Sequence, residues 1–326
     1  MILVLTSKRD GHINGVGNHF DAAHVPWVRV NTEDFAKNVR ININPTDGTG
    51  FIRVLDSNHN FALKSISAVW YRKPDPVDLS HFLLDKASLE YVEAEFNETL
   101  QGIYALLSRT LWINNPLTSR LAHRKMLQLL VARSVGLSTP PTIITNSIQN
   151  ALEFAESVKW DIAIKSLGAV TVTSHRGDSE TQYGMFTRRI GKEELITLQD
   201  KIPYMPTLFQ QYIDKEYELR VTCVGEQIFP CRIYSQNKEV TSEDYRFDTR
   251  NLQHELCAIP EIAHKLLAYM KAFKLNFGCF DIIFSKSGEF IFLECNPNGQ
   301  WLWIEQLTGA PISKAVADML ISGTNK

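Results

Sequence analysis

Apolar and polar residues alternate along this chain in a pattern that predicts three α/β lobes, the first of which spans residues 1–115. Short apolar runs, typical of buried strands, lie at residues 2–5, 27–30 and 68–71. Apolar residues at helical spacing, with glutamates off that stripe, predict an amphipathic helix over residues 89–108. We therefore expect an α/β lobe at the start of the chain.

Two stretches of this lobe carry residues that suit either a ligand or a loop. Gly11, Gly15 and Gly17 follow the first strand, but they lack the GxGxxG order and a Walker lysine, so they predict a flexible loop. Arg72 and Lys73, in the run VWYRKP, follow the third strand at the sheet edge where ligands of open α/β sheets lie. Solvated loop cations are an equal alternative for this pair.

The second lobe, residues 116–206, is predicted to hold a strand-helix-strand unit behind a first helix. That helix carries Lys125, with Thr118 or Ser119 as its N-cap. Lys165 stands at a strand end before a loop of small residues, where its charge and the backbone N–H groups suit a phosphate. A solvated surface lysine is the alternative for Lys165.

The third lobe, residues 207–326, contains the strongest candidate for chemistry, a β-hairpin over residues 280–295. Asp281 opens its first strand, and Glu294 and Asn296 close the second, where residues two apart face the same side. Two carboxylates and an amide suit Mg²⁺, whereas the softer ligands of zinc are absent at ligand spacing. The alternative is a hairpin with acidic strand ends, but an unpaired charge in such an apolar run is costly.

Polar residues on the first strands of the third lobe can contact a nucleotide. Backbone groups at a strand-to-linker edge can bind adenine, an acidic side chain can accept ribose hydroxyls, and guanidinium groups suit the charge of a transferred phosphoryl group. The strand-to-linker edge holds Gln211, Tyr212 and Ile213. The acidic side chain is Glu218, and the guanidinium groups belong to Arg220 and Arg232. A sheet with one solvated face explains the same alternation of charged and apolar residues.

Composition narrows the class of protein. With 326 residues, 44% hydrophobic side chains and a net charge of −2, the chain is long enough for several packed lobes and is neither disordered nor, by bulk charge, a nucleic-acid binder. Its five cysteines show no CxxC spacing and predict reduced thiols in a cytoplasmic protein. No apolar run approaches the roughly 20 residues of a membrane span, and the apolar start is too brief for a signal peptide.

The order of these features resembles the ATP-grasp superfamily, whose members use ATP to activate a carboxylate as an acyl phosphate and join it to a nucleophile. Asp281, Glu294-x-Asn296 and the Pro-Asn-Gly that follows are similar to the metal-binding end of that fold. Further stretches resemble the peptide maturases that make graspetides such as microviridins: VWYRKP, NNPLTSRLAHRKMLQLLVARSVGL with PPTIITN, QQYIDKEYELRVTCVG and DYRFDTRN. The resemblance implies an ATP-grasp fold with an N-terminal pre-ATP-grasp lobe, a central small lobe and a C-terminal antiparallel lobe.

The resemblance also implies an activity. Graspetide maturases bind the helical leader of a ribosomal precursor peptide and install ester or amide links between side chains. By this likeness the chain is a homodimeric ligase that uses ATP and Mg²⁺ and produces ADP and phosphate. ATP would be held by Lys125, Lys165, Gln211, Tyr212, Ile213 and Glu218, magnesium by Asp281, Glu294 and Asn296, and Arg220 and Arg232 would serve acyl-phosphate formation. Gln211 departs from the acidic residue of many relatives, although a neutral amide can still accept a hydrogen bond from adenine.

A leader peptide is expected to bind across residues 181–206, where apolar and charged side chains could seat an amphipathic helix. These side chains are Tyr183, Met185, Phe186, Ile190 and Leu195, with Arg188 and Arg189 among them. The equal alternative is that the apolar residues form the core of the second lobe.

Two rival functions remain open. One is a ligase that adds glutamate or another amino acid to a protein tail or small peptide, and the other is a non-catalytic peptide-binding module on a decayed ATP-grasp fold. The intact set of Asp281, Glu294, Asn296, Lys165 and Arg220 argues against decay. A neighbouring precursor gene rich in Thr, Ser, Glu and Asp codons would distinguish a maturase from an amino-acid ligase.

Overall fold

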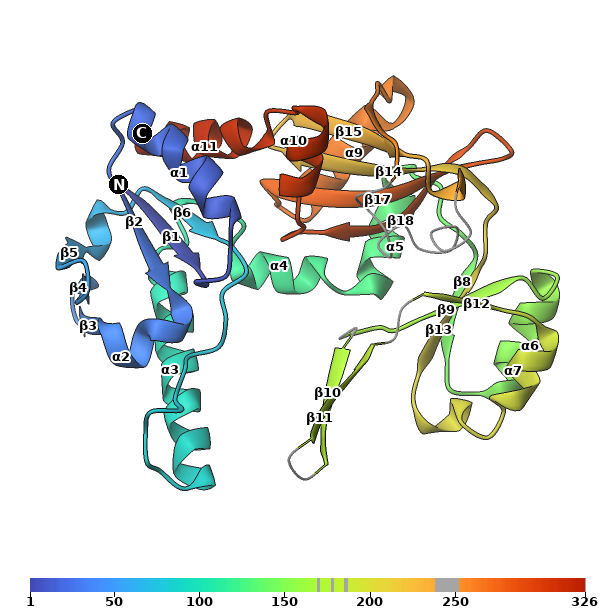
Figure 1. Ribbon diagram of the computed structural model, residues 1–326, viewed down its shortest axis with the longest axis horizontal. Helices are drawn as coiled ribbons and strands as arrows, with labels where there is room; N and C mark the ends of the chain where they lie inside the picture. The colour runs from blue at the N-terminus through green and yellow to red at the C-terminus, as the bar shows by residue number, and fades with distance from the viewer. Residues whose placement is uncertain (169–170, 177–178, 185–186, 238–251, 326) are drawn as a thin grey trace.

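Strands form five sheets within residues 1–168, 171–176, 179–184, 187–237 and 252–325, the parts of the chain that the computed structural model describes (Figure 1). Helices gather around three of these sheets, and this mixture confirms the predicted α/β class. In the described part of the chain, every helix is too short or too polar to span a bilayer. All five cysteines are free thiols, and four of them are buried, as predicted.

A parallel sheet is the centre of the first lobe. Its strands, in sheet order, are β2 (Trp27–Asn31), β1 (Ile2–Thr6), β6 (Ala68–Tyr71) and β7 (Leu111–Ile113). The lobe also holds α1 (His12–Ala22), α2 (Phe35–Asn38), α3 (Lys86–Leu106) and an antiparallel sheet of β3 (Val39–Asn44), β4 (Thr49–Val54) and β5 (His59–Ala62). Every residue of β1 is buried, as its unbroken apolar run predicts.

The glycine-rich segment after β1 forms helix α1, so the prediction of a flexible loop is wrong. Gly15 and Gly17 lie where α1 meets other elements. A Cβ atom at Gly15 would lie 3.2 Å from Ser313 Oγ, and one at Gly17 would lie 3.0 Å from the Trp27 ring. The two glycines therefore serve close packing of a helix, which the spacing of glycines alone does not reveal.

The second lobe is a four-stranded sheet with both of its helices on one face. In sheet order the strands are β12 (Arg188–Ile190), β9 (Ile162–Lys165), β13 (Thr207–Gln211) and β8 (Thr142–Thr145). The helices are α6 (Ile148–Ser157) and α7 (Lys192–Thr197). A separate hairpin is formed by β10 (Thr171–Arg176) and β11 (Ser179–Gly184). The Ser147 side chain accepts the N–H of Asn150 and begins α6, as the capping pattern predicts.

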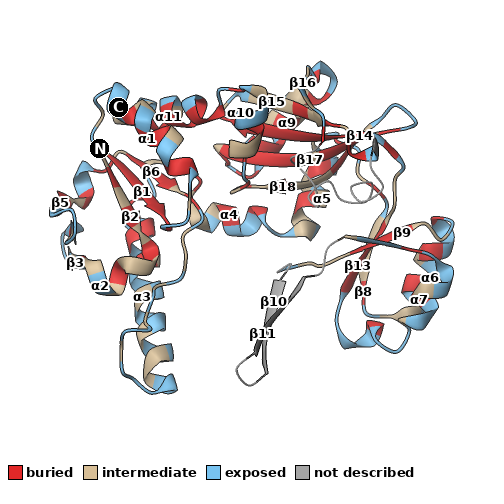
Figure 2. Ribbon diagram, in the orientation of Figure 1, coloured by how far each residue is buried: buried red, intermediate tan, exposed pale blue. Residues whose placement is uncertain are grey.

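The third lobe is an antiparallel sheet of five strands, of which two neighbouring inner strands, residues 215–224 and 277–285, are mostly buried (Figure 2). Its strands, in sheet order, are β16 (His254–Leu256), β15 (Gln227–Ile233), β14 (Lys215–Val224), β17 (Phe277–Ser285) and β18 (Phe290–Asn296). The helices are α9 (Pro260–Ala272), which packs on one face, α10 (Leu302–Thr308) and α11 (Ile312–Ser322), which lies beside α1 of the first lobe (Figure 1).

The helix predicted through Lys125 is interrupted and forms α4 (Pro116–Ala122) and α5 (Lys125–Ser134). Asn115, rather than Thr118 or Ser119, caps α4, because its side chain accepts the N–H of Leu117 and the following proline suits the first helical position.

The core of the third lobe includes Ala122 and Ala132 from these two helices. Residues 116–137 therefore pack with the third lobe, although the predicted boundary assigned them to the second.

Part of the stretch predicted to bind a leader is core instead. Ile190 and Leu195 are buried together with Ala151, Ile162 and Phe209, so core packing is the correct alternative for these two residues. Phe186, the side chain of Tyr183 and the run DYRFDTRN lie outside the described residues.

Truncation of Leu195 tests this core assignment. We expect Leu195→Ala to lower the free energy of unfolding by roughly 2–5 kcal/mol, because a large apolar side chain is removed from a packed interior. Ile196, the next residue, is 43% exposed, and Ile196→Ala is the matched control, with an expected loss below about 1 kcal/mol. Denaturant unfolding measures both losses, and losses of equal size would contradict the assignment.

Candidate active site

A row of charged side chains crosses the third-lobe sheet. Arg220 on β14 lies opposite Asp281 on β17, and Asp281 lies opposite Glu294 on β18. Residues directly paired in an antiparallel sheet present their side chains on one face. Arg220 Nη1 donates to both carboxylate oxygens of Asp281, each at 2.8 Å. The structure thus brings together the two carboxylates that the hairpin predicts, with a guanidinium beside them.

Asn296 extends this row along the edge strand. It lies opposite Cys279, which precedes Asp281 by two residues on β17, so Asn296 and Glu294 occupy successive positions of one strand face. The Asn296 Oδ1 accepts the N–H of Asn298 at 2.9 Å, and the chain turns away from the sheet there.

Helix α5 brings a lysine to the acidic end of the row. Gln128 Nε2 donates to the carbonyl of Cys295 at 2.8 Å, and Gln128 Oε1 accepts the N–H of Cys295 at 3.0 Å. Because β18 is an edge strand, this pair of bonds satisfies backbone groups that no further strand reaches. Lys125 lies on the same side of the helix as Gln128, and its Nζ lies 3.4 Å from Glu294 Oε2.

Sequence reasoning missed Gln128. The sequence places this amide among the apolar positions of a helix, and a polar group buried there needs hydrogen-bond partners. That pattern could have marked Gln128 as a residue with a specific contact. The partner itself lies far away in the chain, so the sequence does not identify it.

The donor set of the row fits Mg²⁺. Within the described residues, no group of three or more His, Cys, Asp or Glu side chains could hold a metal ion. The site offers instead the carboxylates of Asp281 and Glu294 and the amide of Asn296. Few protein ligands, all hard oxygens, are what Mg²⁺ takes beside a nucleotide.

Glu218 lies on the same face as Arg220, two residues earlier on β14, and forms a buried ion pair. Its Oε1 lies 2.8 Å from Lys215 Nζ. The strand register shifts between Lys215 and Tyr217, and this bulge brings Lys215 to the face of Glu218. Burial raises the pKa of Glu218, and the nearby Lys215 opposes that rise. Strict alternation places Lys215 on the other face, which is why sequence reasoning missed it.

The second lobe presents Lys165 at the end of β9, as predicted. Lys165 Nζ donates to Gln210 Oε1 at 2.8 Å, and Gln210 Nε2 donates to Thr142 Oγ1 at 2.9 Å. Gln210, not Gln211, therefore contacts this lysine, because neighbouring residues of a strand point to opposite faces.

Gln211, Tyr212 and Ile213 lie at the end of β13 and in the linker to β14. The N–H groups of Gln211 and Tyr212 donate to the carbonyls of Pro141 and Asp161, both at 2.9 Å. The linker is thus tied to the second lobe through its backbone.

The two arginines expected to bind a leader already have partners in the chain. Arg189 donates to both oxygens of Asp161, at 2.7 and 2.8 Å, and its guanidinium lies 4.1 Å from the centre of the Tyr212 ring. Arg188 pairs with Glu194. Charge reversal at these arginines would break contacts that hold the linker and β12, so it cannot isolate leader binding.

Arg232 is not beside Arg220. Its strand partner is Leu219, whose side chain points to the opposite face of the sheet from Arg220. The Arg232 guanidinium lies 4.4 Å from the centre of the Tyr217 ring and 3.7 Å from Glu255. The prediction that Arg232 also serves acyl-phosphate formation stays a prediction, and the register of β15 places its side chain on the opposite face of the sheet from Arg220.

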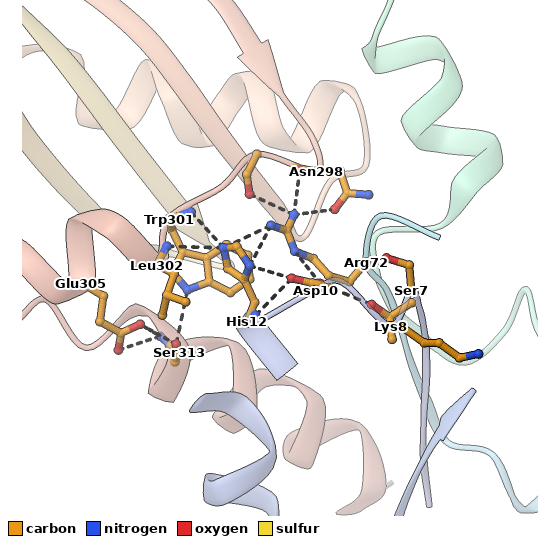
Figure 3. Close-up of polar contacts among 12 residues, drawn as sticks. Ser7, Lys8, Asp10, His12, Arg72, Asn298, Trp301, Leu302, Glu305 and Ser313 are labelled. Atoms are coloured by element: carbon orange, nitrogen blue, oxygen red, sulfur yellow. Dashed lines mark hydrogen bonds and ion pairs between the residues drawn. The ribbon is translucent and has the colours of Figure 1, made fainter. Parts of the chain in front are cut away.

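A buried cluster joins the first lobe to the segment that follows Asn296 (Figure 3). Arg72 Nη1 donates to the carbonyls of Asn298 and Gly299 at 2.7 and 3.1 Å. Arg72 Nε lies 3.3 Å from Asp10 Oδ2 as an ion pair. One of the two cations expected at the sheet edge is thus a fully buried link between lobes.

His12 completes this cluster as a neutral imidazole. Its Nδ1 lies 2.7 Å from Asp10 Oδ1 and donates to it, while Nε2 faces the N–H groups of Trp301 and Leu302, both at 3.4 Å. Burial lowers the pKa of His12, and the charge of Arg72 adds to this effect against that of Asp10.

Asn114 fixes the start of β17 and the end of β18. Its Nδ2 donates to the carbonyls of Phe277 and Pro297, both at 2.7 Å, and its Oδ1 accepts the N–H of Asn276 at 2.8 Å. The first asparagine of the Asn-Asn-Pro run therefore ties β17 and β18 together, a role that sequence reasoning missed.

The chain is similar to one protein family and, over nearly its whole length, to several solved structures. Residues 1–120 match the family described as the MvdD pre-ATP grasp domain. A RiPP-associated ATP-grasp ligase of Chryseobacterium gregarium, solved in complex with ADP and a leader and core peptide, is 26% identical with a TM-score of 0.87, and the match covers 98% of this chain and 96% of that one.

Two macrocyclases of Microcystis aeruginosa are also similar. MdnC, solved with precursor peptide MdnA, is 31% identical with a TM-score of 0.85 over 99% of both chains. MdnB is 28% identical with a TM-score of 0.78 over 98% of both chains. A search of the curated proteins finds no match.

Fold and site together define an ATP-grasp enzyme, an ATP-dependent ligase. Within that class, the chain belongs to the family of RiPP-associated ATP-grasp ligases that includes the macrocyclases MdnC and MdnB. The resemblance to graspetide maturases is confirmed.

The neutral His12 predicts a pH-dependent stability. Because its pKa in the folded chain is lowered, the unfolded chain takes up the proton first as the pH falls, so the free energy of unfolding drops on acidification through the ordinary histidine range. When the pH is lowered from about 7.5 to about 5.5, the free energy of unfolding of the wild type should fall by about 1 kcal/mol more than that of His12→Gln. Denaturant unfolding at both pH values measures this, and identical losses would contradict the neutral assignment.

Proposed function

We propose that this ligase uses ATP and Mg²⁺ to activate Asp or Glu side chains of a ribosomal precursor peptide as acyl phosphates, and that it then closes intramolecular ester or amide links. The likeness to a ligase solved with ADP, leader and core peptide and to a macrocyclase solved with its precursor supports this substrate class. The structural observation that carries the proposal is the charged row of Arg220, Asp281 and Glu294, extended by Lys125.

Each carboxylate of the row is paired with a cation. Asp281 binds Arg220, and Glu294 lies beside Lys125. Magnesium with a nucleotide offers a partner to every member of these pairs, since the metal takes the carboxylates and the phosphates take the cations. The side chains can thus exchange partners without leaving a buried charge unpaired, which would be costly.

The reaction then follows from the positions of the cations. The bond between the γ-phosphorus and the ADP oxygen breaks as a peptide carboxylate oxygen bonds to that phosphorus. Arg220 stabilises the charge on the equatorial phosphoryl oxygens, and Mg²⁺, when bound, polarises the same oxygens. A hydroxyl or amine of the same peptide then attacks the acyl carbon, the C–O bond to phosphate breaks, and the proton of the nucleophile passes to the leaving phosphate.

The remaining nucleotide contacts are assigned by position. Lys165 at the end of β9 and Glu218 on the face of Arg220 suit phosphate and ribose, and Gln211, Tyr212 and Ile213 suit the adenine edge. Leader docking near Tyr183 and Phe186, a homodimer and a cytoplasmic site of action remain predictions, and sedimentation in solution tests the second.

Replacement of the metal ligands tests the row. Glu294→Gln keeps the shape of the side chain but removes a charge from the metal shell, so precursor-dependent release of ADP should fall about 100-fold. Glu289→Gln, in the exposed turn of the same hairpin, is the matched control with wild-type turnover expected. Normal turnover of Glu294→Gln, or AMP and pyrophosphate as products, would refute the proposal.

Arg220→Lys tests the role of the guanidinium. Lysine keeps the charge but loses the planar fork, so we expect the single-turnover rate to fall at least about tenfold while the nucleotide Kd changes little. An unchanged rate with weakened nucleotide binding would assign Arg220 to the ground state instead.

A further inference from the structure

A pocket of about 540 Å³ opens between the first lobe and α10. The loops after β1 and β6 line one side of it with Arg9, Asp10 and Lys73, and Gln300 and Gln306 line the other. The second cation of the VWYRKP run therefore faces a cavity, whereas Arg72 beside it is buried in the link between lobes.

The pocket adjoins the charged row through Gln300. The carbonyl of Gln300 accepts from Arg220 Nη2 at 3.2 Å, and the same guanidinium holds Asp281. Gly299 permits this approach, because a Cβ atom there would lie 2.9 Å from Arg220 Nη2. A group bound in the pocket thus lies next to the arginine that serves the transferred phosphoryl group.

Lys73 supplies the surplus positive charge of the pocket. Arg9 is paired with Asp75 at 2.9 Å, and Asp10 is shared by His12 and Arg72. Among the described residues, no carboxylate forms an ion pair with Lys73. Burial, then the charge of Arg72, lowers the pKa of Lys73, and the charge of Asp10 opposes this effect without cancelling it.

The backbone at Lys73 is held in an unusual conformation. Its φ is +42°, in the left-handed region that residues with a β-carbon rarely adopt. Strain of this kind persists where the surrounding structure fixes it and gathers at functional sites.

We propose that Lys73 and this pocket bind the core-peptide carboxylate that is to be phosphorylated. The assignment rests on the proposed function and adds to it the group that selects an acidic side chain. The Lys73 ammonium neutralises the carboxylate and holds it beside Arg220, and the amides of Gln300 and Gln306 can bond to the peptide around it.

A double-mutant cycle on binding tests the proposal. The probe is a precursor peptide with a leader and with Asp and Glu in its core, compared with the same peptide in which Asn and Gln replace those core residues. Affinities are measured with Mg²⁺ and ADP present, so that no turnover occurs. We expect wild-type enzyme to bind the acidic form about tenfold more tightly, and Lys73→Gln to bind both forms alike.

Two further variants make the result decisive. Lys73→Gly removes the charge and relieves the positive φ, so a loss of discrimination in this variant as well does not arise from misfolding. Lys8→Gln is the matched control, because Lys8 lies in the loop after β1, points away from the cluster in Figure 3 and is paired with Asp34. It should keep the full discrimination.

Other outcomes overturn the assignment in distinguishable ways. Discrimination that survives in Lys73→Gln, or is lost equally in Lys8→Gln, shows that Lys73 does not bind the carboxylate. Weakened ADP affinity in Lys73→Gln with unchanged discrimination places Lys73 at the nucleotide. Failure of the proposed function itself appears differently, as wild-type enzyme that releases no ADP from ATP with the acidic form of the precursor.

Discussion

The buried guanidinium of Arg72 is the contact on which the geometry of the site depends. It extends from the carboxyl end of β6 in the first lobe and binds the carbonyls of Asn298 and Gly299, directly after the hairpin of β17 and β18. The next residue, Gln300, presents its carbonyl to Arg220. A buried arginine is costly without partners, so the first lobe fixes the loop that backs the charged row.

Two further side chains from earlier parts of the chain also hold the strands of the site in place. Asn114 binds the start of β17 and the residue after β18, and Gln128 docks α5 on the edge strand β18 so that Lys125 reaches Glu294. The residues proposed to do the chemistry thus come mostly from the last third of the chain, while the side chains that hold them in place come from earlier segments. This division explains why the N-terminal lobe accompanies the sheet of the third lobe: it positions the charged row and lines the pocket beside it.

Sequence predicted the parts of the site that depend on local order. Glu294 and Asn296 share one face because they lie two residues apart on one strand, and the short hairpin brings Asp281 near them. A register shift between Asp281 and Ile282 then places Asp281 opposite Glu294. Sequence reasoning failed where strand register, or contacts between distant parts of the chain, decide which side chains meet. A bulge brings Lys215 to Glu218, the pairing of β15 turns Arg232 to the far face, and Gln128 finds its partner only through the fold. Packing, too, turned a glycine-rich stretch into a helix, against its composition.

The central claim is that the charged row transfers the γ-phosphoryl group of ATP to a peptide carboxylate. It is tested most directly by labelling the core Asp and Glu carboxylates of the precursor with ¹⁸O and analysing the phosphate released during turnover. An acyl phosphate predicts phosphate that carries one ¹⁸O atom from the peptide, because attack at the acyl carbon leaves the bridging oxygen on phosphorus. Cross-linked product formed with unlabelled phosphate would contradict the account.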